Sequence, residues 1–151
     1  MTRSRQLTYA GPDMSKRGRM ALMAAKITDD LKAFIEANRP SLVATSSKTG
    51  EPNVSPKMSL RVLDDEHLVF ADVMSPKTRQ NVQENPRVCV LLLSVQERRG
   101  YQFKGSAEYI ANGPLYEQVA AGLKKAMPAL PPPVGVVRIH VEDIFEVRGM
   151  A

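Results

Sequence analysis

The stretch best suited to binding a ligand runs from Ser75 to Asn81 and reads Ser-Pro-Lys-Thr-Arg-Gln-Asn. Ser75 is a favoured helix N-cap residue, and Pro76 suits the first helical position because its φ is already set. A helix starting here leaves unpaired N–H groups beside the ammonium of Lys77 and the hydroxyl of Thr78. Free amides, the positive helix end and a cation together make a phosphate site. A capped surface helix with solvated charges is the alternative that this stretch leaves open.

A second polar surface is predicted on the strand that covers residues 53–63. Alternate residues share one face of a strand, and one face here carries hydroxyls and cations, at Ser55, Lys57, Ser59 and Arg61. The other face carries Val54, Pro56, Met58, Leu60 and Val62. The polar face is either a solvated surface or a wall for a flat, hydrogen-bonding, anionic ligand. One hairpin separates this strand from the predicted helix start, so the two can be neighbours.

The remaining reactive residue types limit which kinds of metal or catalytic site the chain can form. The single cysteine, Cys89, lies in an apolar segment and is interpreted as an inert core thiol. One cysteine excludes a disulfide framework within the chain and every multi-cysteine metal site. The two histidines, His67 and His140, are too few for a histidine-rich site, so no metal is expected. No Ser-His-Asp or paired-carboxylate arrangement indicates hydrolysis, and no catalytic residue can be named.

Alternating and apolar segments predict about six strands and few helices. Strands are expected over residues 42–45, 53–63, 67–73, 87–95, 101–110 and 134–147, the fourth of them buried on both faces. Helices are expected from Thr28 to Pro40, from Pro76 to Glu84 and from Pro114 to about Met127. Connections of hairpin length favour antiparallel pairing, and six twisted strands in one small domain close most easily into a barrel. The expected fold is therefore mainly β.

The positive charge of the chain is concentrated at its start. The chain has 21 Lys and Arg against 16 Asp and Glu, a net charge of +5 and a pI near 9.5. Residues 1–26 carry that whole excess, through Arg3, Arg5, Lys16, Arg17, Arg19 and Lys26 against Asp13. Because the rest is neutral and few aromatics accompany the arm, nucleic acid is not an expected partner. We divide the chain into a basic arm, 1–26, flexible or helical in part, and one domain, 27–151.

The apolar segments are too short to span a membrane. The longest near-apolar run, from Val88 to Val95, is far below the about 20 residues that a transmembrane helix needs. The apolar stretch 20–25 follows basic residues, as in a signal peptide, but it is shorter than the required about 7–15 residues and Lys26 ends it. A cytoplasmic protein without a membrane partner is expected.

Five segments, in this order and spacing, resemble the FMN-binding split-barrel flavoproteins, the family of pyridoxamine 5′-phosphate oxidase and the small bacterial FMN-binding proteins. They are residues 55–64, 68–72, 77–81, 85–88 and 105–107, which read SPKMSLRVLD, LVFAD, KTRQN, NPRV and GSA. The resemblance implies a six-stranded antiparallel split β-barrel of Greek-key type with short flanking helices. It also implies FMN as the cofactor and a homodimer with the flavin site at its interface.

The resemblance further implies roles for individual residues. In the family the first segment lies along the isoalloxazine ring, the basic helix start holds the FMN phosphate, and the hairpin at 98–101 reaches the partner's flavin. The implied cofactor-binding set is Ser55, Pro56, Lys57, Met58, Ser59, Arg61, Asp72, Ser75, Lys77, Thr78, Asn81 and Arg99. Lys77-Thr78 stands where the oxidase itself has an Arg-Lys pair, so oxidation of vitamin B6 is not expected.

Two classes of function are open at this point. One is an FMN-dependent oxidoreductase that passes electrons between a reductant and an unknown small molecule, with the flavin carrying the chemistry. The other is an FMN-binding protein without turnover, an electron carrier or flavin store, or the same barrel holding deazaflavin or haem. The sequence identifies neither the substrate nor the electron donor.

Overall fold

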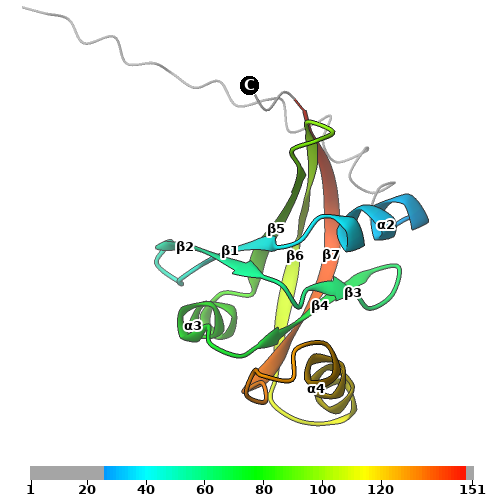
Figure 1. Ribbon diagram of the computed structural model, residues 1–151. Helices are drawn as coiled ribbons and strands as arrows, with labels where there is room; N and C mark the ends of the chain where they lie inside the picture. Colours follow the sequence, from blue (N-terminus) through cyan, green and yellow to red (C-terminus); the bar gives the residue numbers. More distant parts are fainter. Residues whose placement is uncertain (1–25, 149–151) are drawn as a thin grey trace, which may run out of the picture.

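A computed structural model describes residues 26–148 as a curved antiparallel sheet with flanking helices (Figure 1). The strands are β1 (Ser41–Ser46), β2 (Pro52–Lys57), β3 (Arg61–Val62), β4 (His67–Asp72), β5 (Arg87–Ser94), β6 (Arg99–Ile110) and β7 (Gly135–Arg148). The helices are α2 (Asp29–Ala37), α3 (Pro76–Glu84) and α4 (Pro114–Ala126). The basic arm expected at the start of the chain lies outside the described residues, apart from Lys26. Among the described helices, none is long and apolar enough to cross a membrane.

The order of the strands forces the sheet to curl. The order is β2-β1-β5-β6-β7-β4-β3, and every neighbouring pair is antiparallel. The two edge strands, β2 and β3, are consecutive in the chain and are separated by residues 58–60 alone. The edges must therefore come together without pairing to each other, which leaves the barrel split. This topology confirms the antiparallel split barrel.

The structure divides one expected strand in two. Residues 53–63 alternate without interruption, yet the chain bends at Met58 and Ser59 and passes from one sheet edge to the other. The Ser59 hydroxyl accepts a hydrogen bond from the backbone N–H of Ala71 at 3.0 Å, which fixes the bend against β4. Leu60 follows the bend and is fully buried. The sheet therefore has seven strand segments where six were expected.

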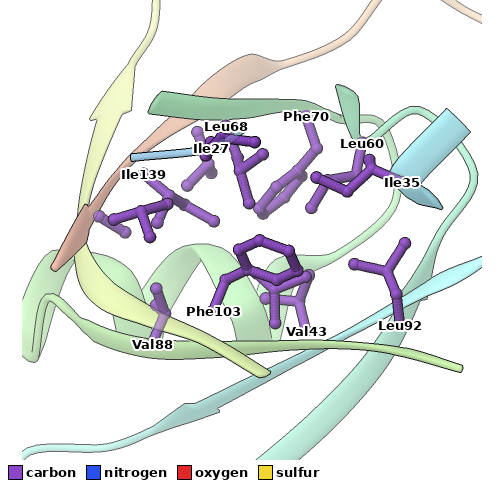
Figure 2. Close-up of a cluster of buried hydrophobic side chains, with 14 of the residues drawn as sticks. Ile27, Ile35, Val43, Leu60, Leu68, Phe70, Val88, Leu92, Phe103 and Ile139 are labelled. Carbon is purple, nitrogen blue, oxygen red and sulfur yellow. The ribbon is translucent and has the colours of Figure 1, made fainter. Parts of the chain in front are cut away.

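The main core fills the inside of the curled sheet. Figure 2 shows Val43, Leu92 and Phe103 on one side of the core facing Leu68 and Phe70 on the other, and all five are fully buried. Phe103 comes from β6 and Phe70 from β4, so the two aromatic rings join distant strands. Burial of these side chains is the main source of stability.

A second, smaller cluster lies between the other face of β4 and α4. It contains Val69, Ala71, Val119, Leu123 and Val136. Strand β4 is therefore buried on both faces, whereas β5, for which double burial was expected, alternates buried and half-buried residues. Cys89 lies on the half-buried face of β5 rather than in the core, and burial raises the pKa of its thiol.

Candidate functional site

The helix expected after Ser75 forms as α3, and its first turn is open to a ligand. Ser75 occupies the N-cap position and Pro76 the first helical position. Among the described residues, no hydrogen bond uses the backbone N–H groups of Lys77 and Thr78. The Lys77 side chain is exposed, and no ion pair or hydrogen bond engages it within residues 26–148. Two amides, an ammonium and a positive helix end thus remain for an anion.

Ser75 occupies the N-cap position but does not cap the helix with its side chain. The predicted N-cap position is confirmed, but the hydroxyl forms no capping hydrogen bond. Its Oγ instead accepts a hydrogen bond from Nζ of Lys57 on β2, and its N–H donates to Oδ1 of Asp72 at 3.1 Å. Ser75 therefore ties the start of α3 to β2 and to the end of β4.

Asp72 stabilises the position of α3 through hydrogen bonds to its residues. Its side chain is 1% exposed, and its Oδ2 accepts a hydrogen bond from Nε of Arg79 at 2.6 Å and one from the hydroxyl of Tyr109 at 3.3 Å. The hydrogen bond to Asp72 raises the pKa of Arg79, and burial together with the nearby carboxylate raises the pKa of Tyr109. Both carboxylate oxygens of Asp72 are engaged by the protein, so Asp72 positions the start of α3. Its expected contact with the cofactor stays a prediction.

A network of hydroxyl and amide side chains fastens α3 to β1 and β2. The Oγ1 of Thr78 lies 3.0 Å from Oγ of Ser55 and 3.4 Å from Nδ2 of Asn53. The Oγ1 of Thr45 accepts hydrogen bonds from Nδ2 of Asn53 at 3.3 Å and from Nδ2 of Asn81 at 3.0 Å. We call these five residues the polar seam. Asn81 is fully buried, and its Oδ1 is an acceptor without a partner among the described residues.

The polar seam changes the role expected of Thr78. Its side chain is 2% exposed and turned toward Ser55, so its backbone N–H rather than its hydroxyl faces outward from the helix start. Asn81 supports the helix as expected, through its bond to Thr45. Sequence reasoning missed Thr45, although Thr45 lies directly opposite Asn53 in the β1–β2 register, so that both share one face of the sheet.

Lys57 adds a buried ammonium beside the start of α3. Its side chain is 6% exposed, and its Nζ lies 5.4 Å from the centre of the Phe70 ring. Burial lowers the pKa of Lys57, and the carboxylate of Asp72 offsets part of this effect. A lysine with a lowered pKa gives up its proton, and with it its positive charge, more readily than an exposed lysine does.

The apolar face of β2 points outward. Its polar residues turn toward α3, while Val54 and Met58 are 62% and 54% exposed, and Pro56 between them is also exposed. Met74, just before α3, is 79% exposed. We call Val54, Pro56, Met58 and Met74 the apolar edge. A contiguous exposed apolar surface beside a polar site is typical of an interaction surface.

Three residues of the expected set lie away from α3. Ser59 holds the β2–β3 bend, as described above. Arg61 lies against α4, where a Cβ added to Gly122 would come within 2.8 Å of its Nη1. Arg99 begins β6, where its Nε lies 2.6 Å from the carboxylate of Glu97 and its guanidinium 5.6 Å from the centre of the Phe34 ring. Its expected approach to the flavin of a second subunit stays a prediction.

Fold and site together define a split-barrel protein in which a basic helix start lies beside a polar strand. The chain belongs to the pyridoxamine 5′-phosphate oxidase family, whose sequence model matches residues 27–148. The match covers the whole barrel, including α3 and the seam beneath it.

Individual relatives agree with this assignment. An uncharacterized protein of Methanocaldococcus jannaschii is 34% identical over 125 residues, which are 82% of each chain. The crystal structure of HupZ from Group A Streptococcus is 30% identical with a TM-score of 0.74, covering 82% of this chain and 95% of its own.

Two more distant structures share the fold and differ in the ligand that their names give. An FMN-binding protein from Syntrophomonas wolfei is 16% identical with a TM-score of 0.69, covering 91% of this chain and 93% of its own. HutZ, a heme storage protein from Vibrio cholerae, is 18% identical with a TM-score of 0.63, covering 80% and 94%. At these identities the likeness concerns the barrel alone.

Proposed function

We propose that the protein is an FMN-binding flavoprotein that acts as an oxidoreductase on a small molecule. The observation that carries the proposal is the open first turn of α3, where the amides of Lys77 and Thr78 and the Lys77 ammonium are free. Family membership supports FMN over other phosphate-bearing ligands. A cytoplasmic location is part of the proposal, and the low cysteine content supports it.

The residues present fit FMN by the chemistry of their donors. The start of α3 would hold the phosphate, because charge-assisted hydrogen bonds from amides and an ammonium suit a phosphate dianion. The side chains of Ser55 and Lys57 on β2 would face the polar edge of the ring system. When bound, FMN supplies hydride or single-electron transfer. Lys57 would then stabilise negative charge on the ring, and Asp72 and Ser75 would keep its ammonium in place.

We further propose that a second copy of the chain covers the apolar edge and makes the protein a homodimer. Val54, Met58 and Met74 expose apolar side chains directly beside the proposed cofactor site. Burying them against the same surface of a partner would shield the flavin from water and follows the self-complementary geometry of a two-fold dimer. In that arrangement Arg99 would approach the partner's cofactor.

A flavin carrier without turnover would use the same residues. Steady-state reduction by NADH or NADPH with an acceptor distinguishes the two functions, because a carrier is reduced without sustained turnover. Haem is a weaker candidate for this site, because haem iron needs an axial ligand. The two histidines, His67 and His140, are opposite each other on β4 and β7, with ring centres 5.2 Å apart, and not on the polar face of β2.

The decisive experiment is reconstitution with FMN. We expect the purified protein to show flavin absorbance, either as isolated or after incubation with FMN, and Lys77→Ala to weaken FMN binding about tenfold to a hundredfold. Lys125→Ala, which removes an exposed lysine of α4, is the matched control and should bind FMN normally. A protein that never acquires flavin absorbance would overturn the proposal, and unchanged binding by the Lys77 variant would put the phosphate elsewhere.

A further inference from the structure

His67 on β4 and His140 on β7 form a cross-strand pair. The two residues lie directly opposite each other in the antiparallel β4–β7 register, so their side chains leave the same face of the sheet. The centres of the two imidazole rings are 5.2 Å apart, and the ring planes are tilted by 43° to each other. The pair is open to the surface, because His67 is half-buried and His140 is exposed.

The distance between the two rings matches that of imidazoles which share a metal ion. In a tetrahedral site each ligating nitrogen lies about 2.0–2.1 Å from the metal, which places two ring centres about 5 Å apart. Imidazole is a preferred ligand of divalent transition metals such as Zn²⁺, Cu²⁺ and Ni²⁺. The β4–β7 register therefore already gives the two rings the spacing of a two-histidine ligand set.

Asp64 orients the ring of His67 for this role. The Nδ1 of His67 lies 2.8 Å and 3.1 Å from the two carboxylate oxygens of Asp64. Because an ionised carboxylate only accepts hydrogen bonds, Nδ1 donates, which leaves Nε2 of the neutral ring with a free lone pair. The N–H of Glu66 donates to Oδ1 of Asp64 at 2.8 Å and holds the carboxylate in place. Histidines that ligate metals almost always have such a partner on the other ring nitrogen.

His140 is available as the second ligand. Within residues 26–148, no hydrogen bond or ion pair engages its ring, whose recorded contact is with the ring of His67. The backbone of His140 is held by close packing against β6, because a Cβ added to Gly105 would overlap the backbone oxygen of His140. The strand position is thus fixed, while the exposed ring can turn to present either nitrogen to an ion.

We propose that His67 and His140 bind a divalent transition-metal ion, represented by Zn²⁺, on the exposed face of β4 and β7. No group of three or more His, Cys, Asp or Glu side chains within residues 26–148 is placed to hold a metal, so the two imidazoles are the protein ligands and water completes the shell. Glu142, two residues after His140, is left out because Arg87 engages both of its carboxylate oxygens, at 2.9 and 2.7 Å.

This site is separate from the proposed cofactor site. His67 begins β4, whereas Asp72 at the other end of the same strand supports α3. A metal was not expected from the sequence, because two histidines are too few for a histidine-rich site. The count of histidines does not show that both occupy one point of the sheet, which only the pairing of β4 with β7 determines.

The test is calorimetric titration of the full chain with ZnCl₂, together with thermal unfolding with and without the ion. We expect a saturable Zn²⁺ site and a higher melting temperature, because an ion that binds the folded chain stabilises it. His67→Gln and His140→Gln should each weaken binding of Zn²⁺ about tenfold or more and abolish the rise in melting temperature. Asp64→Asn removes the charge of the acceptor that orients His67 and should weaken binding about tenfold to a hundredfold.

Arg138→Gln is the matched control. It breaks an exposed pair with Glu108 on the same sheet, leaves both imidazoles in place and should bind Zn²⁺ no more weakly than the wild type. MgCl₂ is the second probe, because Mg²⁺ prefers oxygen ligands and should not displace Zn²⁺ from two imidazoles.

Weaker Zn²⁺ binding in both histidine variants, with normal binding by the control, supports the inference. A wild type that binds no Zn²⁺, or equal Zn²⁺ affinity of the wild type and both histidine variants, overturns it. Displacement of Zn²⁺ by an equal concentration of Mg²⁺ also overturns it, because the exposed acids of residues 64–66 then hold the ion. These measurements need no flavin, so their outcome does not depend on the proposed function.

Discussion

The Nζ of Lys57 on β2 donates a hydrogen bond to Oγ of Ser75, the residue that begins α3. This bond joins the two elements that the sequence marks as candidate ligand surfaces, a polar strand and a basic helix start. The bond also holds a buried charge, since Lys57 is 6% exposed, and Asp72, whose carboxylate acts on that charge, already accepts hydrogen bonds from Arg79 and Tyr109. The site therefore holds an ammonium that is costly in the folded state without a bound anion.

Because of Lys57, the free energy of unfolding should change with pH in the alkaline range. Burial lowers its pKa below the ordinary 10.5, so between the folded and the unfolded pKa the unfolded chain binds more protons. The free energy of unfolding should therefore rise with pH through the window just below 10.5. In Lys57→Met this contribution should be absent. Urea denaturation of both proteins at neutral pH and near 10.5 measures it, and parallel pH profiles would contradict the assignment.

Asp72 should matter more for stability than an exposed acid does. Asp72→Asn removes the charge beside Arg79 and disturbs the hydrogen bonds from Ser75 and Tyr109. We expect the free energy of unfolding to fall by about 1–3 kcal/mol, the usual cost of disrupting buried hydrogen bonds to a charged group.

The matched control for Asp72→Asn is Glu142→Gln, which breaks the pair between Arg87 and Glu142. The side chains of that pair are 56% and 36% exposed. Exposed pairs contribute about 0–1 kcal/mol, so the control should remain close to wild type. Equal losses in the two variants would show that Asp72 does not brace α3. FMN affinity should fall in Asp72→Asn alone, because only that change loosens the helix start.

The apolar edge should control association. Val54→Asp places a charge at a position that is 62% exposed in the single chain and would be buried in the proposed homodimer. We expect a dimer for the wild type and a folded monomer for the variant, measured by sedimentation equilibrium. Leu130→Asp is the control, because Leu130 is 39% exposed and lies in the loop between α4 and β7, outside the apolar edge. A monomeric wild type would contradict the dimer.

Local signals in the sequence predicted the helices well. Thr28 caps α2 by accepting a hydrogen bond from the N–H of Leu31 at 3.4 Å, and Pro76 and Pro114 each stand in the first turn of their helix. These features depend on residues within one helical turn, so the local sequence is enough to predict them. The same local reasoning predicted that the first turn of α3 leaves the amides beside Lys77 unbonded, and that they bind an anion stays a prediction.

Features that depend on contacts between distant segments could not be predicted in this way. Alternation continues through Met58 and Ser59, so nothing local marks the bend, which forms because the closing sheet must place β3 beside β4. The bond from Tyr109 to Asp72 spans 37 residues and has no sequence signature. The alternating sequence of β2 correctly predicted which residues share a face of the strand. It could not predict which face turns inward, because that depends on hydrogen bonds between the hydroxyl and amide side chains of the polar seam, which come from distant segments.

Gly122 offers a test of the space around Arg61. A Cβ at this position would come within 2.8 Å of Nη1 of Arg61, at the end of a flexible side chain that can move aside. Replacing glycine by alanine inside a helix also favours the helix by about 0.8–1.0 kcal/mol. Gly122→Ala should therefore displace the guanidinium and still fold with stability equal to or above that of wild type. Thermal unfolding of the two proteins measures this. A clear loss of stability in the variant would show that the guanidinium cannot move aside.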